Sequence, residues 1–403
     1  MITLPPLCMP LPPKDNYWFV LGRESLLAAA ELGAVLNLRS YDLRDSILKT
    51  SVPFEPRILI KQLGGTVKIA AETACGVSPE NLVTTMAETL KGYQGKVVFG
   101  ISFYNPNSDN KAAAASVKRW GMELKKTLKA GGYPARLVFK DEAVLSSVTV
   151  EINDLISKGS EFIVQEENGL YNLAATRAVQ PFKEFSSRDY GRPGRDDLSG
   201  MLPPKLAMMI INLSMCPREG VLLDPFCGSG TILSEAMLLG YANVIGSDLS
   251  PSAIKDTKNN IRWTADNFPV SHPVSDIQIF QSAVERLSSR LKNSSVDSIV
   301  TEPYLGKPLR GRETKEDLLR QVHELKRLYI NSFKQFYDLL KPQGKIVFII
   351  PRFKYKNEWI TIDCLDNIKN IGFKPVPLLP DKISLLYARP DQLIGREIWR
   401  FEK

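Results

Sequence analysis

The segment with the clearest chemical signature is Asp224–Thr231, which reads Asp-Pro-Phe-Cys-Gly-Ser-Gly-Thr. It follows a short apolar run, Val221–Asp224, and precedes residues whose apolar positions have helical spacing. Its two glycines allow a sharp turn and the close approach of a ligand, just before a helix N-terminus. The segment lacks the third glycine of the dinucleotide fingerprint and the Gly-Lys-Ser/Thr of a P-loop. A carboxylate at this strand end instead predicts a ligand that carries a positive group.

A second acidic residue, Asp248, ends the next predicted strand, 24 positions after Asp224. In doubly wound nucleotide-binding folds, a carboxylate about 20 residues beyond the glycine turn accepts hydrogen bonds from ribose hydroxyls. The spacing of the two carboxylates therefore predicts a nucleoside ligand.

These side chains need a sheet whose strand ends meet at one edge. The C-terminal half alternates between apolar strand patterns and amphipathic helix patterns, which predicts a mostly parallel, doubly wound α/β sheet with its ligand site at the carboxyl ends of the strands. The predicted strands are Val221–Asp224, Asn243–Ser247, Ile277–Gln281, Val296–Val300 and Lys345–Ile350. The predicted helices are Thr231–Leu239, Pro251–Trp263, Val284–Leu291 and one from about Lys315 to Leu340.

The N-terminal half has a less regular α+β pattern. Strands are predicted at Tyr17–Leu21, Arg57–Leu63, Lys96–Ser102 and Arg136–Lys140, with a strand pair within Glu161–Leu173. Helices are predicted at Glu24–Leu36, Pro79–Leu90 and Asp109–Lys129. Residues 181–204 are rich in Arg, Asp, Ser, Gly and Pro with little apolar periodicity, which is typical of an interdomain connection.

The overall composition indicates a globular protein of two or three domains, with 403 residues, 24% charged and 44% hydrophobic. Five cysteines without a C-x-x-C pair and two histidines argue against a structural zinc site, so we expect no metal. No apolar run is long enough to span a membrane and no signal peptide is visible, so we expect a cytoplasmic protein.

The net charge of +8 permits a nucleic-acid partner without requiring one. Residues 1–180 contribute +2 and residues 181–403 contribute +6, so neither half is a basic tail. The positive residues cluster locally, at Lys118–Lys129, Lys307–Arg312 and Arg389–Arg400.

The glycine turn and the sequence Gly246–Ser250 (Gly-Ser-Asp-Leu-Ser) resemble the S-adenosylmethionine-binding motifs of Rossmann-like methyltransferases. The order of the halves is similar to that of the THUMP-domain tRNA guanine-N2 methyltransferases. Supporting segments are Arg188–Pro193, Met201–Ala207, Arg389–Gln392 and Arg396–Ile398. The resemblance implies S-adenosylmethionine as cofactor and tRNA as partner. It also implies a ferredoxin-like α+β domain (1–70), a THUMP-like RNA-binding domain (71–180), a linker (181–204) and a Rossmann-like methyltransferase domain (205–403).

The resemblance assigns roles to individual cofactor-binding residues. Asp224 would face the methionine amino group, and Asp248 would bind the ribose hydroxyls. After the third strand, where the family commonly has an acidic residue near the adenine amine, this chain has Ser282, so its hydroxyl or a backbone amide would serve. The full expected set is Asp224, Pro225, Phe226, Cys227, Gly228, Ser229, Gly230, Thr231, Asp248, Leu249, Ser282 and Ala283.

The family's catalytic motif, Asp or Asn followed by Pro-Pro-Tyr, corresponds here to Thr301-Glu302-Pro303-Tyr304. The resemblance implies that this segment accepts hydrogen bonds from an exocyclic base amine, while Tyr304 stacks on the base. Thr301 stands where the Asp or Asn is expected, so Glu302 would supply the carboxylate one residue later. The alternative is that Thr301 and Glu302 leave a weak or inactive site.

The resulting hypothesis is methyl transfer to guanine-N2 of tRNA. Expected substrate contacts are Arg192, Lys205, Lys118, Arg119, Lys125 and Lys126. Two alternatives stay open: methylation of adenine or cytosine amines in DNA, and a tRNA-binding protein that has lost turnover.

Overall fold

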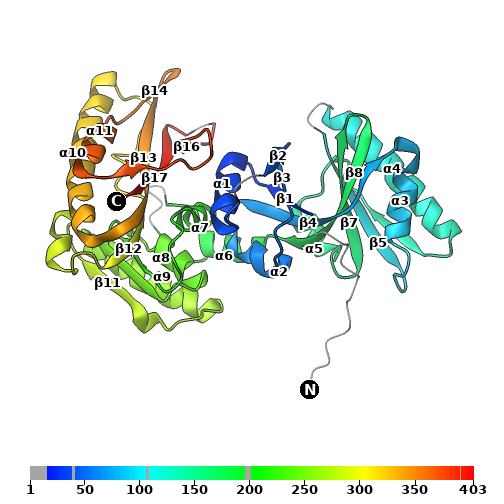
Figure 1. The fold of residues 1–403 in the computed structure, drawn as a ribbon, viewed down its shortest axis with the longest axis horizontal. Helices are drawn as coiled ribbons and strands as arrows, with labels where there is room; N and C mark the ends of the chain where they lie inside the picture. Colours follow the sequence, from blue (N-terminus) through cyan, green and yellow to red (C-terminus); the bar gives the residue numbers. More distant parts are fainter. Residues whose placement is uncertain (1–15, 39–40, 106–108, 196–200, 391) are drawn as a thin grey trace. The chain divides into compact units, whose positions relative to one another are not determined.

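The computed structural model describes residues 16–38, 41–105, 109–195, 201–390 and 392–403, and their contacts divide the chain into two compact units. Unit 2 comprises Glu24–Leu38, Gln62–Gly65 and Lys183–Lys403, and unit 1 comprises the other described residues. Both units combine helices with a β-sheet (Figure 1). The division is not sequential, because two short N-terminal segments belong to unit 2.

Unit 1 is built on one eight-stranded mixed sheet in the order β2-β3-β1-β4-β8-β7-β5-β6. Its strands are β1 (Tyr17–Leu21), β2 (Asp42–Arg44), β3 (Ile47–Thr50), β4 (Thr66–Val77), β5 (Val97–Tyr104), β6 (Ala135–Val138), β7 (Gly159–Glu167) and β8 (Leu170–Val179). Its helices are α2 (Pro56–Leu59), α3 (Leu82–Thr89), α4 (Asn110–Ala130) and α5 (Ser147–Ile152). Apolar residues of α3 and α4 pack on β5 and form the main core of this unit (Figure 1).

Two features of unit 1 differ from the sequence prediction. The strand predicted at Arg57–Leu63 is wrong: the segment forms α2 and a 3-10 turn at Ile60–Gln62, because Pro56 starts the helix and the Glu55 carboxylate caps it at Ile58 N. The twelve-residue strand β4 was not predicted. It pairs with both β1 and β8, and the boundary expected between residues 70 and 71 lies inside it.

Unit 2 contains the predicted doubly wound sheet. Its main path runs β11-β10-β9-β12-β13-β17-β15, in which β9 to β13 are parallel and β17 is antiparallel to β13. The strands are β9 (Val221–Asp224), β10 (Asn243–Asp248), β11 (Ile277–Gln281), β12 (Val296–Thr301), β13 (Leu340–Tyr355), β14 (Glu358–Ile360), β15 (Lys374–Pro375), β16 (Ser384–Tyr387) and β17 (Ile394–Glu402).

The helices of unit 2 cover this sheet. They are α1 (Ser25–Val35), α6 (Phe182–Tyr190), α7 (Pro204–Leu213), α8 (Thr231–Leu238), α9 (Pro251–Asn267), α10 (Lys315–Leu339) and α11 (Leu365–Ile371), with a 3-10 helix at Val284–Ser289 in place of a predicted α-helix. The aromatic face of α10, including Tyr329 and Phe333, packs on Phe348 of β13. This contact fixes α10 beside the carboxyl ends of the parallel strands.

The segment expected to be a connection, residues 181–204, is partly helical. It contains α6, whose Arg188 is buried and forms an ion pair with Glu235 of α8. Because Phe185 is also buried, α6 packs as part of unit 2 despite its polar composition.

Helix α1 is held in unit 2 by a buried carboxylate. Glu31 accepts hydrogen bonds from Gly64 N, Gly65 N and Asn212 Nδ2, each at 2.8 Å, and burial raises its pKa to about 7 despite these bonds. Asn212 belongs to α7, so the carboxylate ties α1 and the Gly64-Gly65 turn to the same helix.

None of the described helices has the length and apolar character needed to cross a bilayer.

Candidate active site

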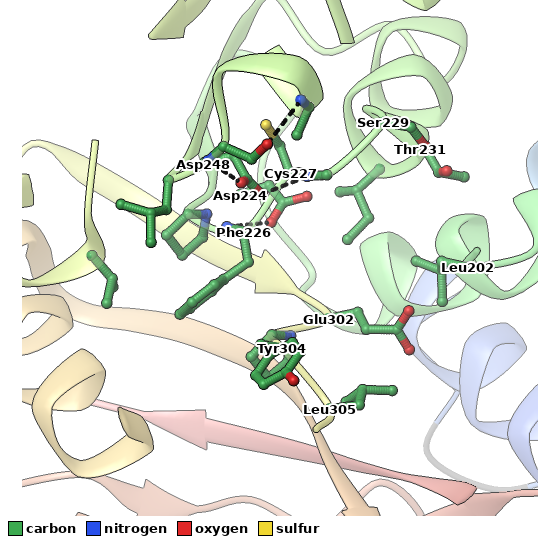
Figure 2. A pocket seen from close by; sticks show the side chains of 18 of the residues that line it. Leu202, Asp224, Phe226, Cys227, Ser229, Thr231, Asp248, Glu302, Tyr304 and Leu305 are labelled. Carbon is green, nitrogen blue, oxygen red and sulfur yellow. Dashed lines mark hydrogen bonds between the residues drawn. The ribbon is translucent and has the colours of Figure 1, made fainter. Parts of the chain in front are cut away.

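The candidate site lies at the carboxyl ends of β9, β10 and β12. Strand β9 lies between the other two, with Gly246 of β10 opposite Asp224 and Ile299 of β12 opposite Leu223. The chain leaves this point in opposite directions along the sheet, and open α/β sheets bind ligands at such switch points. A cavity of about 950 Å³ opens here. Figure 2 shows Asp224 and Asp248 on one side of it and Glu302 and Tyr304 on the other.

The glycine turn has the geometry that its sequence predicted. Gly228 and Gly230 have φ angles of +52° and +84°, and α8 starts directly after them at Thr231. A Cβ atom on Gly230 would lie 2.9 Å from Thr257 Cγ2, so a side chain has no room there.

Asp248 connects this turn to the start of α9. Its Oδ2 accepts a hydrogen bond from Gly228 N at 3.0 Å, and its Oδ1 accepts one from Ser250 N at 2.8 Å. Each carboxylate oxygen retains a second lone pair. Because Asp248 lines the cavity, those lone pairs can accept the hydroxyls of a ribose.

Asp224 is 1% exposed, and both hydrogen bonds it accepts from described residues end on Oδ1. The donors are Phe226 N at 3.2 Å and Thr301 Oγ1 at 2.6 Å. Burial raises the pKa of Asp224 to about 7, although both hydrogen bonds act to lower it. Oδ2 is therefore left to accept from a ligand, and a ligand cation would compensate the cost of the buried charge.

Thr301 has a different position from the one expected. Its hydroxyl is fully buried on Asp224, and Thr301 is not among the residues that line the cavity. Neighbouring strand residues point to opposite sides, so Thr301 contacts the Asp224 side while Glu302 faces the cavity. Thr301, expected as a catalytic residue, therefore lies behind the cavity wall, where its hydroxyl donates to the Asp224 carboxylate.

Glu302 is held by a residue that sequence reasoning did not single out as part of the site. Arg396 of β17 donates from Nε to Oε1 at 2.5 Å and from Nη2 to Oε2 at 3.4 Å. The side chain of Glu302 is 14% exposed and that of Arg396 is 9% exposed. Arg396 occupies one edge of the carboxylate, which leaves the outer lone pairs for a further donor.

Tyr304 presents an accessible ring at the cavity. Its side chain is among the exposed large apolar groups, at 54%, whereas Pro303 is buried. The Tyr304 carbonyl accepts a hydrogen bond from Tyr329 Oη of α10 at 2.8 Å. The loop backbone is thus fixed while the ring stays available for stacking.

The other expected cofactor residues lie around the same cavity. Ser282 N donates to the Asp248 carbonyl at 3.0 Å, and the Ser282 hydroxyl donates to the Ala283 carbonyl. Leu249 is exposed at the rim. The cavity is lined by every residue of the expected cofactor set except Gly230. These residues are Asp224, Pro225, Phe226, Cys227, Gly228, Ser229, Thr231, Asp248, Leu249, Ser282 and Ala283.

The expected substrate contacts are dispersed. Arg192 is buried, bonds to Thr231 Oγ1 and does not line the cavity, so the structure contradicts its expected place on the substrate surface. Lys205 is exposed on α7, near the Phe185 ring. In unit 1, Lys118, Arg119 and Lys126 are exposed on α4, and Lys125 is half-buried.

Among the described residues, no group of three or more His, Cys, Asp or Glu side chains is arranged to hold a metal ion.

Comparisons with known proteins agree with this description. Residues 192–355 match the model of the RMKL-like, methyltransferase domain, and residues 100–259 match a DNA methylase model. The tRNA (guanine(10)-N2)-dimethyltransferase of Methanothermobacter thermautotrophicus is 36% identical over 107 residues, 27% of this chain and 28% of that protein. The protein of the same name from Methanocaldococcus jannaschii is 27% identical over 186 residues, 45% of this chain and 48% of that protein.

This chain thus spans about half or less of the length of these two relatives. TrmN from Thermus thermophilus has a similar fold, with a TM-score of 0.53, 17% identity and coverage of 96% of this chain and 99% of that one. Residues 192–355 of unit 2 are thus similar to a methyltransferase domain, and the strand order is that of a doubly wound sheet.

Proposed function

We propose that this protein transfers a methyl group from S-adenosylmethionine to the exocyclic N2 amine of guanine in tRNA. The observation that carries the proposal is one cavity lined by two sets of groups: Asp224 and Asp248 suit a cationic nucleoside, and Glu302 and Tyr304 suit a base amine.

The cofactor side of the cavity fits the chemistry of S-adenosylmethionine. Asp224 Oδ2 would accept the methionine ammonium group, and Asp248 would accept the ribose hydroxyls. When bound, the cofactor supplies an electrophilic methyl group on a sulfonium. The residues of this chain fix its position, since alignment is the main catalytic contribution available to such a site.

The base side of the cavity fits an extruded nucleotide. A base must leave its stack to reach this cavity, and the exposed Tyr304 ring would stack on it. One N–H of the amine would donate to Glu302, which directs the nitrogen lone pair toward the methyl group. The amine nitrogen would take the methyl group from the bound cofactor, whose S–C electron pair would stay on sulfur. The surplus proton on nitrogen passes to Glu302 or to water.

RNA is favoured as substrate by the names of the relatives and by the exposed positive residues on α4. We infer that residues 71–180 act as a THUMP-like RNA-binding domain after a ferredoxin-like segment, and that Lys118, Arg119 and Lys126 contact phosphates. Binding would then weaken as salt concentration rises.

The direct test incubates the full chain with labelled S-adenosylmethionine and unmodified tRNA, followed by nucleoside analysis. Labelled N2-methylguanosine or N2,N2-dimethylguanosine is the expected product. A parallel sample with duplex DNA tests the alternative that the DNA methylase match favours. Label in adenine or cytosine of DNA, with none in tRNA, would overturn the proposal.

The role of Glu302 is tested by Glu302→Gln. Loss of the acceptor is expected to lower kcat by about 100-fold or more, while the affinity for S-adenosylhomocysteine stays within about threefold. The matched control is Glu316→Gln, an exposed residue of α10 outside the cavity. Unchanged kcat in Glu302→Gln would exclude the acceptor role. Cofactor and tRNA binding without turnover in the unaltered protein would support an inactive binding protein.

A further inference from the structure

A positively charged loop begins two residues beyond Tyr304, and its charged residues have no part in the site described above. It runs from Gly306 to Glu313 and carries three basic residues, Lys307, Arg310 and Arg312, all of which are exposed. Gly306 itself lines the cavity, so the loop starts at the cavity rim. Three residue steps separate Lys307 from Tyr304, so their Cα atoms are at most about 11 Å apart.

The backbone of this loop is fixed by side chains that accept its N–H groups. Gln321 Oε1 accepts from Lys307 N at 2.8 Å. The two oxygens of Glu313 accept from Arg310 N at 2.7 Å and from Arg312 N at 3.0 Å. Gly306 and Gly311 provide the turns, with φ angles of +98° and +76°. The loop is therefore an ordered platform.

The charges on this platform are not neutralised within the described chain. No described carboxylate forms an ion pair with Lys307, Arg310 or Arg312, whereas Arg396 and Arg352 of unit 2 are each paired with a glutamate. Glu313, the nearest acidic residue in sequence, has both oxygens occupied by backbone N–H groups. Three cations held together in this way repel one another and favour an anionic ligand.

We propose that Lys307, Arg310 and Arg312 bind the phosphodiester groups on either side of the target nucleotide. The proposal rests on the proposed function, because it requires a nucleic acid whose base enters the cavity. A base that stacks on Tyr304 keeps its own phosphates outside, at the rim where this loop begins. Guanidinium and ammonium groups bind phosphate through charge-assisted hydrogen bonds, and such contacts set the register of the substrate without reading its sequence.

The test compares two triple variants that remove the same charge. Lys307→Gln/Arg310→Gln/Arg312→Gln removes the platform cations. The matched control, Arg290→Gln/Lys292→Gln/Lys374→Gln, removes three exposed cations near the amino ends of β12 and β15, away from the cavity. For each protein, the KM for tRNA, kcat, the salt dependence of tRNA binding and the affinity for S-adenosylhomocysteine are measured.

The platform variant is expected to raise the KM for tRNA by at least about tenfold. The slope of log Kd against log salt should fall by about 2 to 3, since each phosphate contact contributes about 0.7 to 0.9. Affinity for S-adenosylhomocysteine and kcat at saturating tRNA should change less than about twofold, which also shows that the fold is intact.

Two results would overturn the inference: tRNA binding and salt slope equal to those of the control triple, or a fall in kcat with unchanged KM. Failure of the proposed function is a separate outcome, because the unaltered protein would then neither methylate nor bind tRNA.

Discussion

The raised pKa of Asp224 predicts how the affinity for the cofactor depends on pH. Its pKa is raised from 3.8 to about 7, first of all by burial. Below pH 7 the unliganded protein therefore holds a proton on this carboxyl group. A ligand ammonium group at Oδ2 favours the carboxylate, so binding must displace that proton.

The size of the effect follows from the pKa. Below pH 7 the affinity for the cofactor should fall by up to tenfold for each pH unit, which makes it about 30-fold weaker at pH 5.5 than on the plateau above pH 7. The raised pKa of Asp224 also makes the stability of the unliganded protein depend on pH. Between about pH 4 and pH 7 only the folded state retains the proton on Asp224, so its contribution to stability falls as pH rises through this range.

The assay is calorimetric titration with S-adenosylhomocysteine in two buffers that differ in heat of ionisation. The difference between the two heats counts the protons released. We expect close to one proton at pH 5.5, about half at pH 7 and almost none at pH 8.5. Asp224→Asn should bind weakly with no proton release in this range.

Thr301 offers a second, directional test. Its hydroxyl donates to Asp224 and lowers the pKa of that carboxyl, so Thr301→Val should move the midpoint above pH 7, whereas Thr301→Ser keeps the donor. Affinity that does not depend on pH between 5.5 and 7.5, or a midpoint that moves down in Thr301→Val, would refute the reasoning.

Three further predictions concern single side chains. Glu31→Gln should reduce the free energy of unfolding by about 1 to 3 kcal/mol, because one of its backbone donors loses its acceptor; urea melts would check this against the exposed Glu219→Gln. Tyr304→Ala should lower kcat/KM for tRNA by about 10- to 100-fold because the stacking surface is lost, while Tyr304→Phe should retain most activity. Equal kcat/KM values for the Ala and Phe variants would contradict a stacking role. Arg396→Gln should destabilise the protein by about 3 kcal/mol because it leaves Glu302 unpaired, and the double variant with Glu302→Gln should recover part of that loss in the same melts.

Much of unit 2 could be predicted because its signals are local. Ser250 caps α9 and Pro251 follows at its first position, as the sequence indicates. The strand before Asp224 and the glycines after it predicted the sharp turn that the structure has, and Asp248 accepts a hydrogen bond from Gly228 N of that turn.

The features that sequence reasoning missed depend on distant residues. Glu302 and Arg396 are 94 positions apart and meet only because β17 pairs with β13. The direction of the Thr301 hydroxyl is likewise set by Asp224 on a neighbouring strand. In unit 1, the pattern of β4 includes exposed Gly76 and Cys75, so its pairing on both sides could not be read locally.

Because α1 belongs to unit 2, its position in the sequence affects the order in which the two units can fold during synthesis. Glu31 and Asn212 are separated by 181 positions, and every strand of unit 1 lies before Asn212 in the sequence. During synthesis on the ribosome, α1 is made early. Its apolar residues and the Glu31 carboxylate lack their partners on α7 until that helix has been made. If unit 1 folds before α7 is made, residues 66–182 no longer count as flexible chain between Glu31 and Asn212. The entropic cost of bringing these two residues together then falls by about 1 kcal/mol. Early folding of unit 1 thus offsets the closure cost that its own residues add to unit 2.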